Sequence, residues 1–293
     1  MGWILELITS LWGLLLAPLE FDFMRRAFVA SLLVGTLCAV VGAFVVLKGL
    51  AFIGDALAHA SFAGVAVALV GQGNVYLGAA AAAVFAALAI AAITQRTRVR
   101  ADTAIGVVFV GMLALGVVVA SRIRNYAASV FEFLFGNVLA VSGDDLLLIA
   151  VGSALLLFAI VFFYKEFLFV AFDPEMAAGA GLPVALYDTL LLVLVALTTT
   201  LALRALGVIL VAAMLVTPSA TAYLFVKRLH EQMLLGAALA SLSSLVGLYV
   251  SFYANVSSGA SIVLVSVALF LLALLIAPRA RRGGASLRLF SSH

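Results

Sequence analysis

Long apolar stretches, separated by short polar or glycine-containing breaks, dominate this 293-residue sequence. Nine of them are long enough to cross a lipid bilayer as a helix, which takes about 20 residues. They lie near residues 27–47, 50–71, 75–94, 103–121, 146–164, 185–203, 206–226, 233–254 and 259–277. The period-two alternation of a membrane β-barrel is absent from these stretches. Because an unpaired backbone group in lipid costs several kcal/mol, we expect the stretches to be helices.

The composition agrees with a membrane protein. The chain is 67% hydrophobic and 10% charged, and its mean hydropathy is +1.32. Soluble domains are closer to half apolar and a quarter charged. Small residues, as in the run 78–83, let membrane helices approach one another closely. The sequence therefore predicts an all-α fold, a polytopic helical membrane bundle with about eight or nine transmembrane helices.

A weaker apolar segment precedes the nine stretches, from Trp3 to Leu19. It carries Glu6, lacks a basic start and has no small-x-small cleavage site, so we do not interpret it as a signal peptide. We expect an N-terminal amphipathic or spanning segment at 1–22, a transmembrane domain at 23–278 and a cytoplasmic basic tail at 279–293.

The lysines and arginines predict the orientation, because cytoplasmic loops of membrane proteins carry an excess of them. If the nine stretches alternate in direction, eleven cations share the side of the C-terminus and five lie on the other side. The eleven are Lys48, Arg96, Arg98, Arg100, Lys165, Lys227, Arg228, Arg279, Arg281, Arg282 and Arg288, and the five are Arg25, Arg26, Arg122, Arg124 and Arg204. We expect a cytoplasmic C-terminus in a prokaryotic plasma membrane. The N-terminus is inside if residues 3–19 span the membrane and outside if they do not.

Several function classes are not favoured by the sequence. The single cysteine, Cys38, excludes an internal disulfide and a cysteine-cluster metal site. Basic tracts with interleaved aromatic residues are missing, so nucleic acid is not an expected partner. No H-E-x-x-H motif of an intramembrane metalloprotease occurs, and no G-x-x-x-x-G-K-[ST] loop occurs, so the chain cannot itself supply an ATPase.

Two ionisable residues lie inside the second apolar stretch, in Gly54-Asp55-Ala56-Leu57-Ala58-His59-Ala60-Ser61. Such residues in a membrane helix are costly and are functional candidates by default. Asp55 and His59 are four positions apart and so share one helix face. A carboxylate and an imidazole suit Zn²⁺, Mn²⁺ or Fe²⁺. An interhelical hydrogen bond that fastens the bundle is the alternative, and the pair alone does not decide between the two.

The longest polar interruption, residues 165–183, contains a short segment with a helix signal at each end. Asp173 can cap the helix start, and Pro174 takes the first helical position. Glu175 favours the positive end of the helix dipole. Gly179 or Gly181 then supplies a left-handed stop.

This short helix would lie on the cytoplasmic side, and it carries the apolar Met176. A pump needs such an element for docking on a soluble motor. An ordinary loop helix at the membrane surface is the alternative, and the segment taken alone favours it.

The stretch 206–222 contains Pro218, which removes a backbone donor and would kink or break a spanning helix. The hydroxyls of Thr217, Ser219 and Thr221 can satisfy the freed carbonyls. A bend suits a moving or pore-lining helix, although structural helices also bend. A further apolar stretch with one acid, residues 131–137, could be an external gate or a connector.

The order and content of these features resemble the membrane subunit of ABC-type manganese, zinc and iron importers, the ABC-3 permease family. The resemblance runs from about Phe23 to Pro278. It rests on Phe23-Met24-Arg25-Arg26-Ala27, on Gly42 and Val45-Val46-Leu47-Lys48-Gly49-Leu50-Ala51, on the Gly54–Ala60 block, on Leu134-Phe135-Gly136-Asn137-Val138-Leu139, on Phe172-Asp173-Pro174-Glu175, and on Gly207-Val208-Ile209-Leu210-Val211 with Thr217-Pro218. The Gly-Asp-x-x-x-His and Phe-Asp-Pro-Glu blocks are the most specific.

The resemblance implies a homodimeric permease that works with two cytoplasmic ABC ATPase subunits, which bind the ATP, and with an extracytoplasmic metal-binding protein. It places Asp55 and His59 on the path of the transported ion, makes residues 173–181 the coupling helix, and implies no permanently bound cofactor. Members of the family often have Leu-Pro-Gly after the histidine, where this chain has Phe62-Ala63-Gly64. The missing proline leaves the pore geometry open.

Other transporters remain as alternatives. A siderophore or cobalamin permease would need a wide cavity, and a secondary carrier driven by protons or sodium would use Asp55 as a titrating group. The choice among zinc, manganese and ferrous iron stays open, because an Asp/His pair is compatible with all three.

Overall fold

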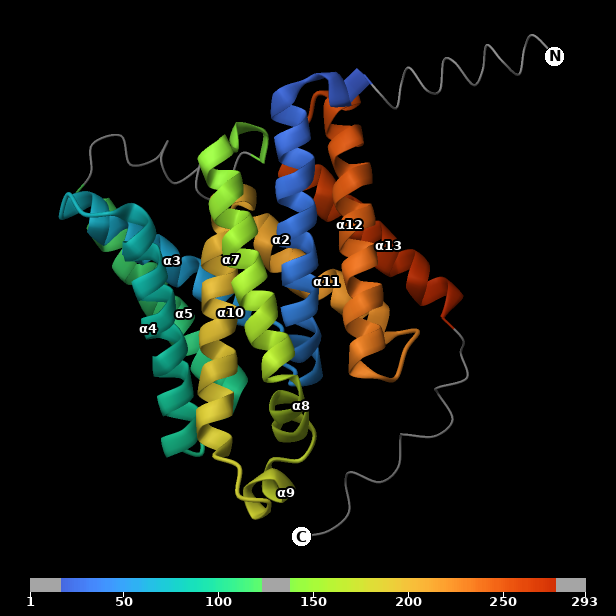
Figure 1. Ribbon diagram of the computed structural model, residues 1–293. Helices are drawn as coiled ribbons and strands as arrows, with labels where there is room; N and C mark the ends of the chain where they lie inside the picture. The colour runs from blue at the N-terminus through green and yellow to red at the C-terminus, as the bar shows by residue number, and fades with distance from the viewer. Residues whose placement is uncertain (1–16, 123–137, 278–293) are drawn as a thin grey trace.

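The computed structural model describes residues 17–122 and 138–277, and within them every regular element is a helix (Figure 1). The long elements are α2 (Asp22–Leu47), α3 (Ile53–Val70), α4 (Val75–Arg96), α5 (Ala101–Ala120), α7 (Gly143–Phe162), α10 (Val184–Leu206), α11 (Val208–Tyr223), α12 (Leu229–Ala254) and α13 (Ser258–Ile276). The short ones are η1 (Ala17–Glu20), η2 (Val138–Ala140), α8 (Tyr164–Phe172) and α9 (Pro174–Gly179).

Among the described residues, eight helices are long and apolar enough to cross a membrane, and α11 is a shorter apolar helix of 16 residues. The predicted fold class, a helical membrane bundle with eight or nine spans, is therefore confirmed. Each predicted apolar stretch coincides with one long helix, and most boundaries differ by a few residues, as expected for frayed helix ends.

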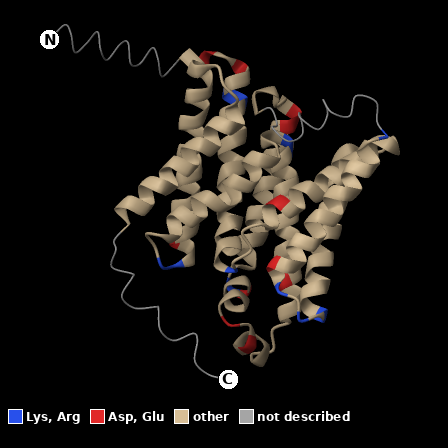
Figure 2. Cartoon of the chain, turned by 180° about the vertical axis from the view of Figure 1, so that it is seen from behind, with Lys and Arg blue, Asp and Glu red and all other residues tan. Residues whose placement is uncertain are grey.

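The long helices run alternately up and down between two ends of the bundle (Figure 1). We call the end that carries α8 and α9 the basal end, and the end where α2, α4 and α7 begin the apical end. The loop after α2, the end of α4 and the start of α10 all lie at the basal end. Charged residues gather near the two ends, and few lie between them (Figure 2).

The bundle consists of two groups of helices that α10 joins. On one side α3 packs against α4 and α5, and on the other α2 packs against α11 and α12. Helix α10 contacts α2, α3, α4 and α7. The central α2 is the most buried of the spanning helices, whereas α7, α5 and α13 are the least buried. Those three therefore have apolar faces free for lipid or for a partner.

Small residues set the spacing inside the first group. Gly64 of α3 and Gly78 of α4 face each other, and a Cβ atom added to Gly64 would collide with the backbone carbonyl of Gly78. In the second group, a Cβ atom on Gly42 of α2 would collide with the carbonyl of Leu215 in α11. Close approach of this kind is how membrane helices gain packing energy without a hydrophobic drive between them.

The Gly64 contact gives a testable prediction. Gly64→Ala should destabilise the purified protein by about 1–3 kcal/mol, because the added methyl group must push α3 and α4 apart. The measurement is the midpoint of thermal unfolding in detergent. Gly111→Ala in α5 is the matched control, since nothing lies within 4 Å of a Cβ atom built there. Equal midpoints for the two variants would refute the assigned packing.

Candidate functional site

Asp55 and His59 lie one turn apart at the start of α3. Between Ile53 and Gly64 they are the two residues that are half-buried, and every other residue of that segment is buried. Helix α3 packs against α4, α5, α10 and α11, so its start is enclosed on several sides. The two candidate ligands therefore share the one accessible face of an otherwise enclosed helix, as their spacing predicted.

Neighbouring residues position this face. Gly54 allows α3 to lie close to α11, because a Cβ atom there would be 3.1 Å from the Leu215 side chain. The His59 ring contacts Phe109 of α5 edge-on, with 5.0 Å between ring centroids and 74° between planes. Two residues further along α3, the Ser61 hydroxyl lies 3.2 Å from the Thr200 hydroxyl of α10. The ligand-bearing turns of α3 are thus held by α5, α10 and α11 together.

As a candidate metal site, the pair of Asp55 and His59 would be incomplete. In the described residues, no group of three or more His, Cys, Asp or Glu side chains comes together around an ion. A carboxylate oxygen and an imidazole nitrogen supply two donors, whereas first-row divalent ions take four to six. If the pair binds an ion, water or a second copy of the chain would have to provide the remainder. Such a partial set suits an ion that has to leave again.

The short helix predicted around residues 173–181 is present as α9. The Asp173 carboxylate accepts a hydrogen bond from the Met176 backbone N–H at 2.9 Å, and Pro174 occupies the first helical position. Glu175 lies in the first turn and Gly179 is the last helical residue.

Gly181 adopts the left-handed backbone conformation with φ +86°, so it provides the stop that the sequence left open between Gly179 and Gly181. Helix α9 also presents apolar surface at the basal tip of the molecule. Met176 is 65% exposed and the neighbouring Phe172 is 67% exposed, while Ala177 is fully buried. Helix α9 is thus anchored by Ala177 and exposes Met176, and Phe172 at the end of α8 adds a second large exposed apolar side chain. This arrangement is suited to docking.

Pro218 is buried inside α11, and the helix continues from Val208 to Tyr223. Of the two outcomes expected of Pro218, a kink or a break, the break does not occur, and the kink remains a prediction. The Thr221 hydroxyl donates to the Thr217 carbonyl at 2.7 Å, within the helix, whereas the carbonyl that lacks a donor because of Pro218 is that of Met214, four residues earlier.

Ser219 corrects a second expectation, because its hydroxyl donates at 2.6 Å to the Ala39 carbonyl of α2 and not to a carbonyl of its own helix. From α12, the Gln232 side chain donates to the Ser219 carbonyl at 3.2 Å. Ser219 thus joins α11 to α2 through its hydroxyl and to α12 through its carbonyl.

The sequence analysis missed two ion pairs between helices. Lys48 at the end of α2 pairs with Asp188 of α10, and Arg204 at the other end of α10 pairs with Asp145 of α7. The Arg204 guanidinium also lies over the Tyr76 ring, 3.9 Å from its centroid. A signal was available, because an ionisable residue within an apolar stretch is expected to have a partner.

Three expectations fall on residues outside the described part of the chain. They concern the spanning or amphipathic segment at 3–19, almost all of which lies before residue 17, the apolar stretch 131–137, and the basic tail at 279–293. Ala63, where related sequences often have proline, lies in the uninterrupted helix α3 and is buried.

Comparison with known proteins places the chain among transport proteins. The model of the ABC 3 transport family matches residues 20–277. The manganese transport system membrane protein MntC of Halalkalibacterium halodurans is 41% identical over 261 residues, which cover 89% of each chain. A probable iron transport system membrane protein of Haemophilus influenzae is 38% identical over 260 residues, 89% of this chain and 96% of that one. The solved structure of PsaBC from Streptococcus pneumoniae in complex with Fab is similar with a TM-score of 0.81 and 34% identity, covering 94% of this chain and 98% of that chain.

Proposed function

Because the chain belongs to the ABC 3 transport family, we propose that it imports manganese or iron as the membrane permease subunit of an ATP-driven transporter. The observation that carries the proposal is the identity of 41% with a manganese transport membrane protein, spread over 89% of both chains. The chain is a multi-pass transport subunit, and the ATPase of such a transporter is a separate subunit.

Asp55 and His59 are the proposed ligands of the ion in transit. They occupy the one accessible face at the start of α3, and their oxygen and nitrogen donors suit divalent first-row metals. Two such faces from a homodimer would supply four donors to one ion. The weakly buried helices α5, α7 and α13 offer apolar surface for contact with a second copy.

Helix α9 is the proposed docking element for the ATPase subunit, and the apical end is the proposed receiving face for an extracytoplasmic binding protein. The basal end would then face the cytoplasm. Its described lysines and arginines number seven against four at the apical end, in agreement with the positive-inside rule. The seven are Lys48, Arg96, Arg98, Arg100, Lys165, Lys227 and Arg228, and the four are Arg25, Arg26, Arg122 and Arg204.

The role of Thr217 and Pro218 is proposed as a flexible point in α11. Proline leaves one carbonyl of the helix without its usual donor, which lowers the cost of bending there. Since Gly54 of α3 packs on α11 near Leu215, bending at Pro218 would move the wall behind the ligand pair.

The ligand proposal predicts the effect of two substitutions. Asp55→Ala and His59→Ala should each lower manganese uptake at least about tenfold, because removing one of two donors weakens capture of the ion in the pore. The measurement is uptake of radioactive manganese by proteoliposomes that contain the permease and its ATPase subunit.

Asp102→Ala and His230→Ala are the matched controls, since both residues are exposed. Normal uptake by the Asp55 and His59 variants would exclude them as ligands. Uptake that persists without the ATPase subunit would favour a secondary carrier, and uptake of iron chelates in place of free ions would favour a siderophore permease.

The docking proposal predicts a loss of coupling in Asp173→Ala. Without the hydrogen bond to Met176 the start of α9 loses about 1 kcal/mol, and this six-residue helix has little else to hold it. Less ATPase subunit should then copurify with the permease. Asn74→Ala removes the N-cap of α4 at the apical end and serves as the control. If the same amount of ATPase subunit copurifies with both variants, α9 is not part of the docking surface.

A further inference from the structure

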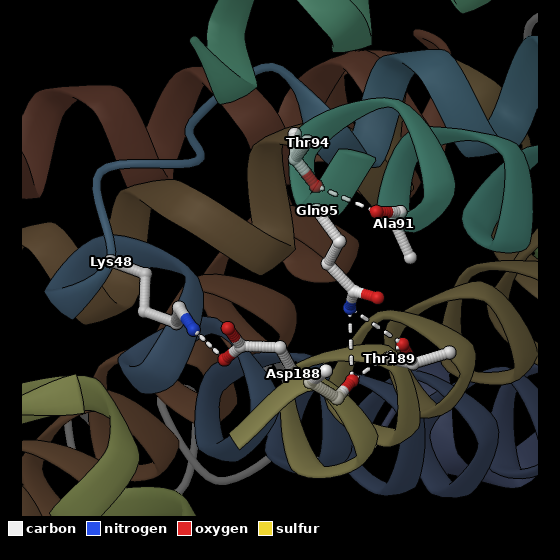
Figure 3. Close-up of polar contacts among 7 residues, drawn as sticks. Lys48, Ala91, Thr94, Gln95, Asp188 and Thr189 are labelled. Atoms are coloured by element: carbon white, nitrogen blue, oxygen red, sulfur yellow. Dashed lines mark hydrogen bonds and ion pairs between the residues drawn. The ribbon is translucent and has the colours of Figure 1, made fainter. Parts of the chain in front are cut away.

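A cluster of polar contacts holds the basal end of α10 to two other helices (Figure 3). Lys48, the residue that ends α2, pairs with the Asp188 carboxylate in the second turn of α10. From the end of α4, the Gln95 side chain donates to the Ala185 carbonyl at 2.9 Å and to the Thr189 hydroxyl at 3.0 Å. The start of α10 is thus tied to both helix groups of the bundle.

The Lys48–Asp188 pair lies close in sequence to both α9 and the start of α3. Helix α9 ends at Gly179, α10 begins at Val184, and Asp188 follows one turn later. On the other side of the pair, Lys48 precedes the turn with Gly49 at φ +69°, and α3 begins at Ile53 with Asp55 in its first turn. The Lys48–Asp188 pair therefore links the segment after α9 directly to the segment before the ligands.

The surroundings of the Lys48–Asp188 pair allow the two side chains to separate and to pair again. The side chains of Lys48 and Asp188 are 20% and 32% exposed, so water can reach both groups when they separate. They line a cavity of about 140 Å³ together with Leu50, Thr94 and Gln95, which leaves room for movement. A fully buried pair would leave an unpaired charge in a dry interior on opening, at a cost of several kcal/mol.

Other ion pairs in the described part of the chain do not share this position. Arg25–Asp22 and Arg228–Glu231 join residues three apart on one helix. Arg204–Asp145 joins α10 to α7 at the apical end. Lys48–Asp188 is the pair that connects α10 with the loop leading to α3.

We propose that the Lys48–Asp188 pair is a positioning contact that carries movement of α9 through α10 to the ligand-bearing start of α3. The pair is closed in the conformation described here. Displacement of α9 by the ATPase pulls the start of α10 away, opens the pair and frees the turn before Asp55. This inference rests on the proposed function of α9 as the docking element.

The first test measures manganese imported per ATP hydrolysed in proteoliposomes. Lys48→Met and Asp188→Asn should each lower that ratio about fivefold or more while hydrolysis continues, because coupling between sites is a free energy that the pair supplies. The exchanged variant Lys48→Asp/Asp188→Lys should recover most of the ratio, which a purely local role of either residue would not give. Arg228→Ala, in an exposed pair at the same end, is the control.

A second test follows the movement itself, and it exploits the single cysteine of the chain. In a Cys38→Ala background, Lys48→Cys/Asp188→Cys should react with a short bismaleimide in the nucleotide-free complex and much less after trapping with ATP and vanadate. The cross-linked complex should not import manganese.

The outcomes of these tests distinguish the positioning role of the ion pair from the proposed function as a manganese importer. Cross-linking that is equal in both nucleotide states, or a normal import ratio in the single variants, overturns the positioning role. Failure of the exchanged variant to recover, with both single variants impaired, overturns it as well. Nucleotide-dependent cross-linking of the cysteine variant, together with no manganese import by the complex of the unsubstituted permease, supports the contact and refutes the proposed cargo.

Discussion

The low polarity of the bilayer interior is the constraint on which the rest of this structure depends. Backbone groups must bond within their own helix, and an ionisable side chain must find a partner or reach the membrane surface. The described ion pairs obey this rule, because Lys48–Asp188 and Arg204–Asp145 sit near opposite ends of α10, sixteen residues or about 24 Å apart along its axis. Asp55 and His59 lie inside a spanning helix, and neither takes part in one of the described ion pairs.

Both ion pairs between helices involve α10, so this helix connects several parts of the bundle. It is tied to α2 and α4 at one end, to α7 and Tyr76 at the other, and to Ser61 of α3 between them. In the proposed movement, α10 keeps its contacts at the apical end while its Lys48–Asp188 contact at the basal end opens. Its chain neighbour on the basal side is α9, where Met176 is exposed, and Phe172 at the end of α8 is exposed as well. The polar contacts are few, but they join the helices that the proposed movement involves.

The sequence predicted the fold class and the nine apolar helices, because hydrophobic length reports membrane spans directly. It also predicted α9, since Asp173, Pro174 and Gly181 are local signals that need no tertiary information. Contacts between distant residues were a different matter. Nothing in the spacing of Lys48 and Asp188, 140 residues apart, indicates that they meet. The hydrogen bond of the Ser219 hydroxyl was expected within its own helix, whereas it is made to α2. The sequence does not reveal that α2 lies so close, because the close approach depends on Gly42 and the packing around it.

The two-donor set on α3 has a consequence for selectivity. Affinities of one set of nitrogen and oxygen donors rise from Mn²⁺ through Fe²⁺ to the later first-row metals, so Asp55 and His59 alone would hold Zn²⁺ more firmly than Mn²⁺. A pore built on them cannot choose manganese by equilibrium binding. Discrimination would have to occur before the ion arrives, and a zinc ion that did enter would dwell there and obstruct the conduit. The accessible face at the start of α3 would then act as a kinetic filter, favouring ions that leave quickly.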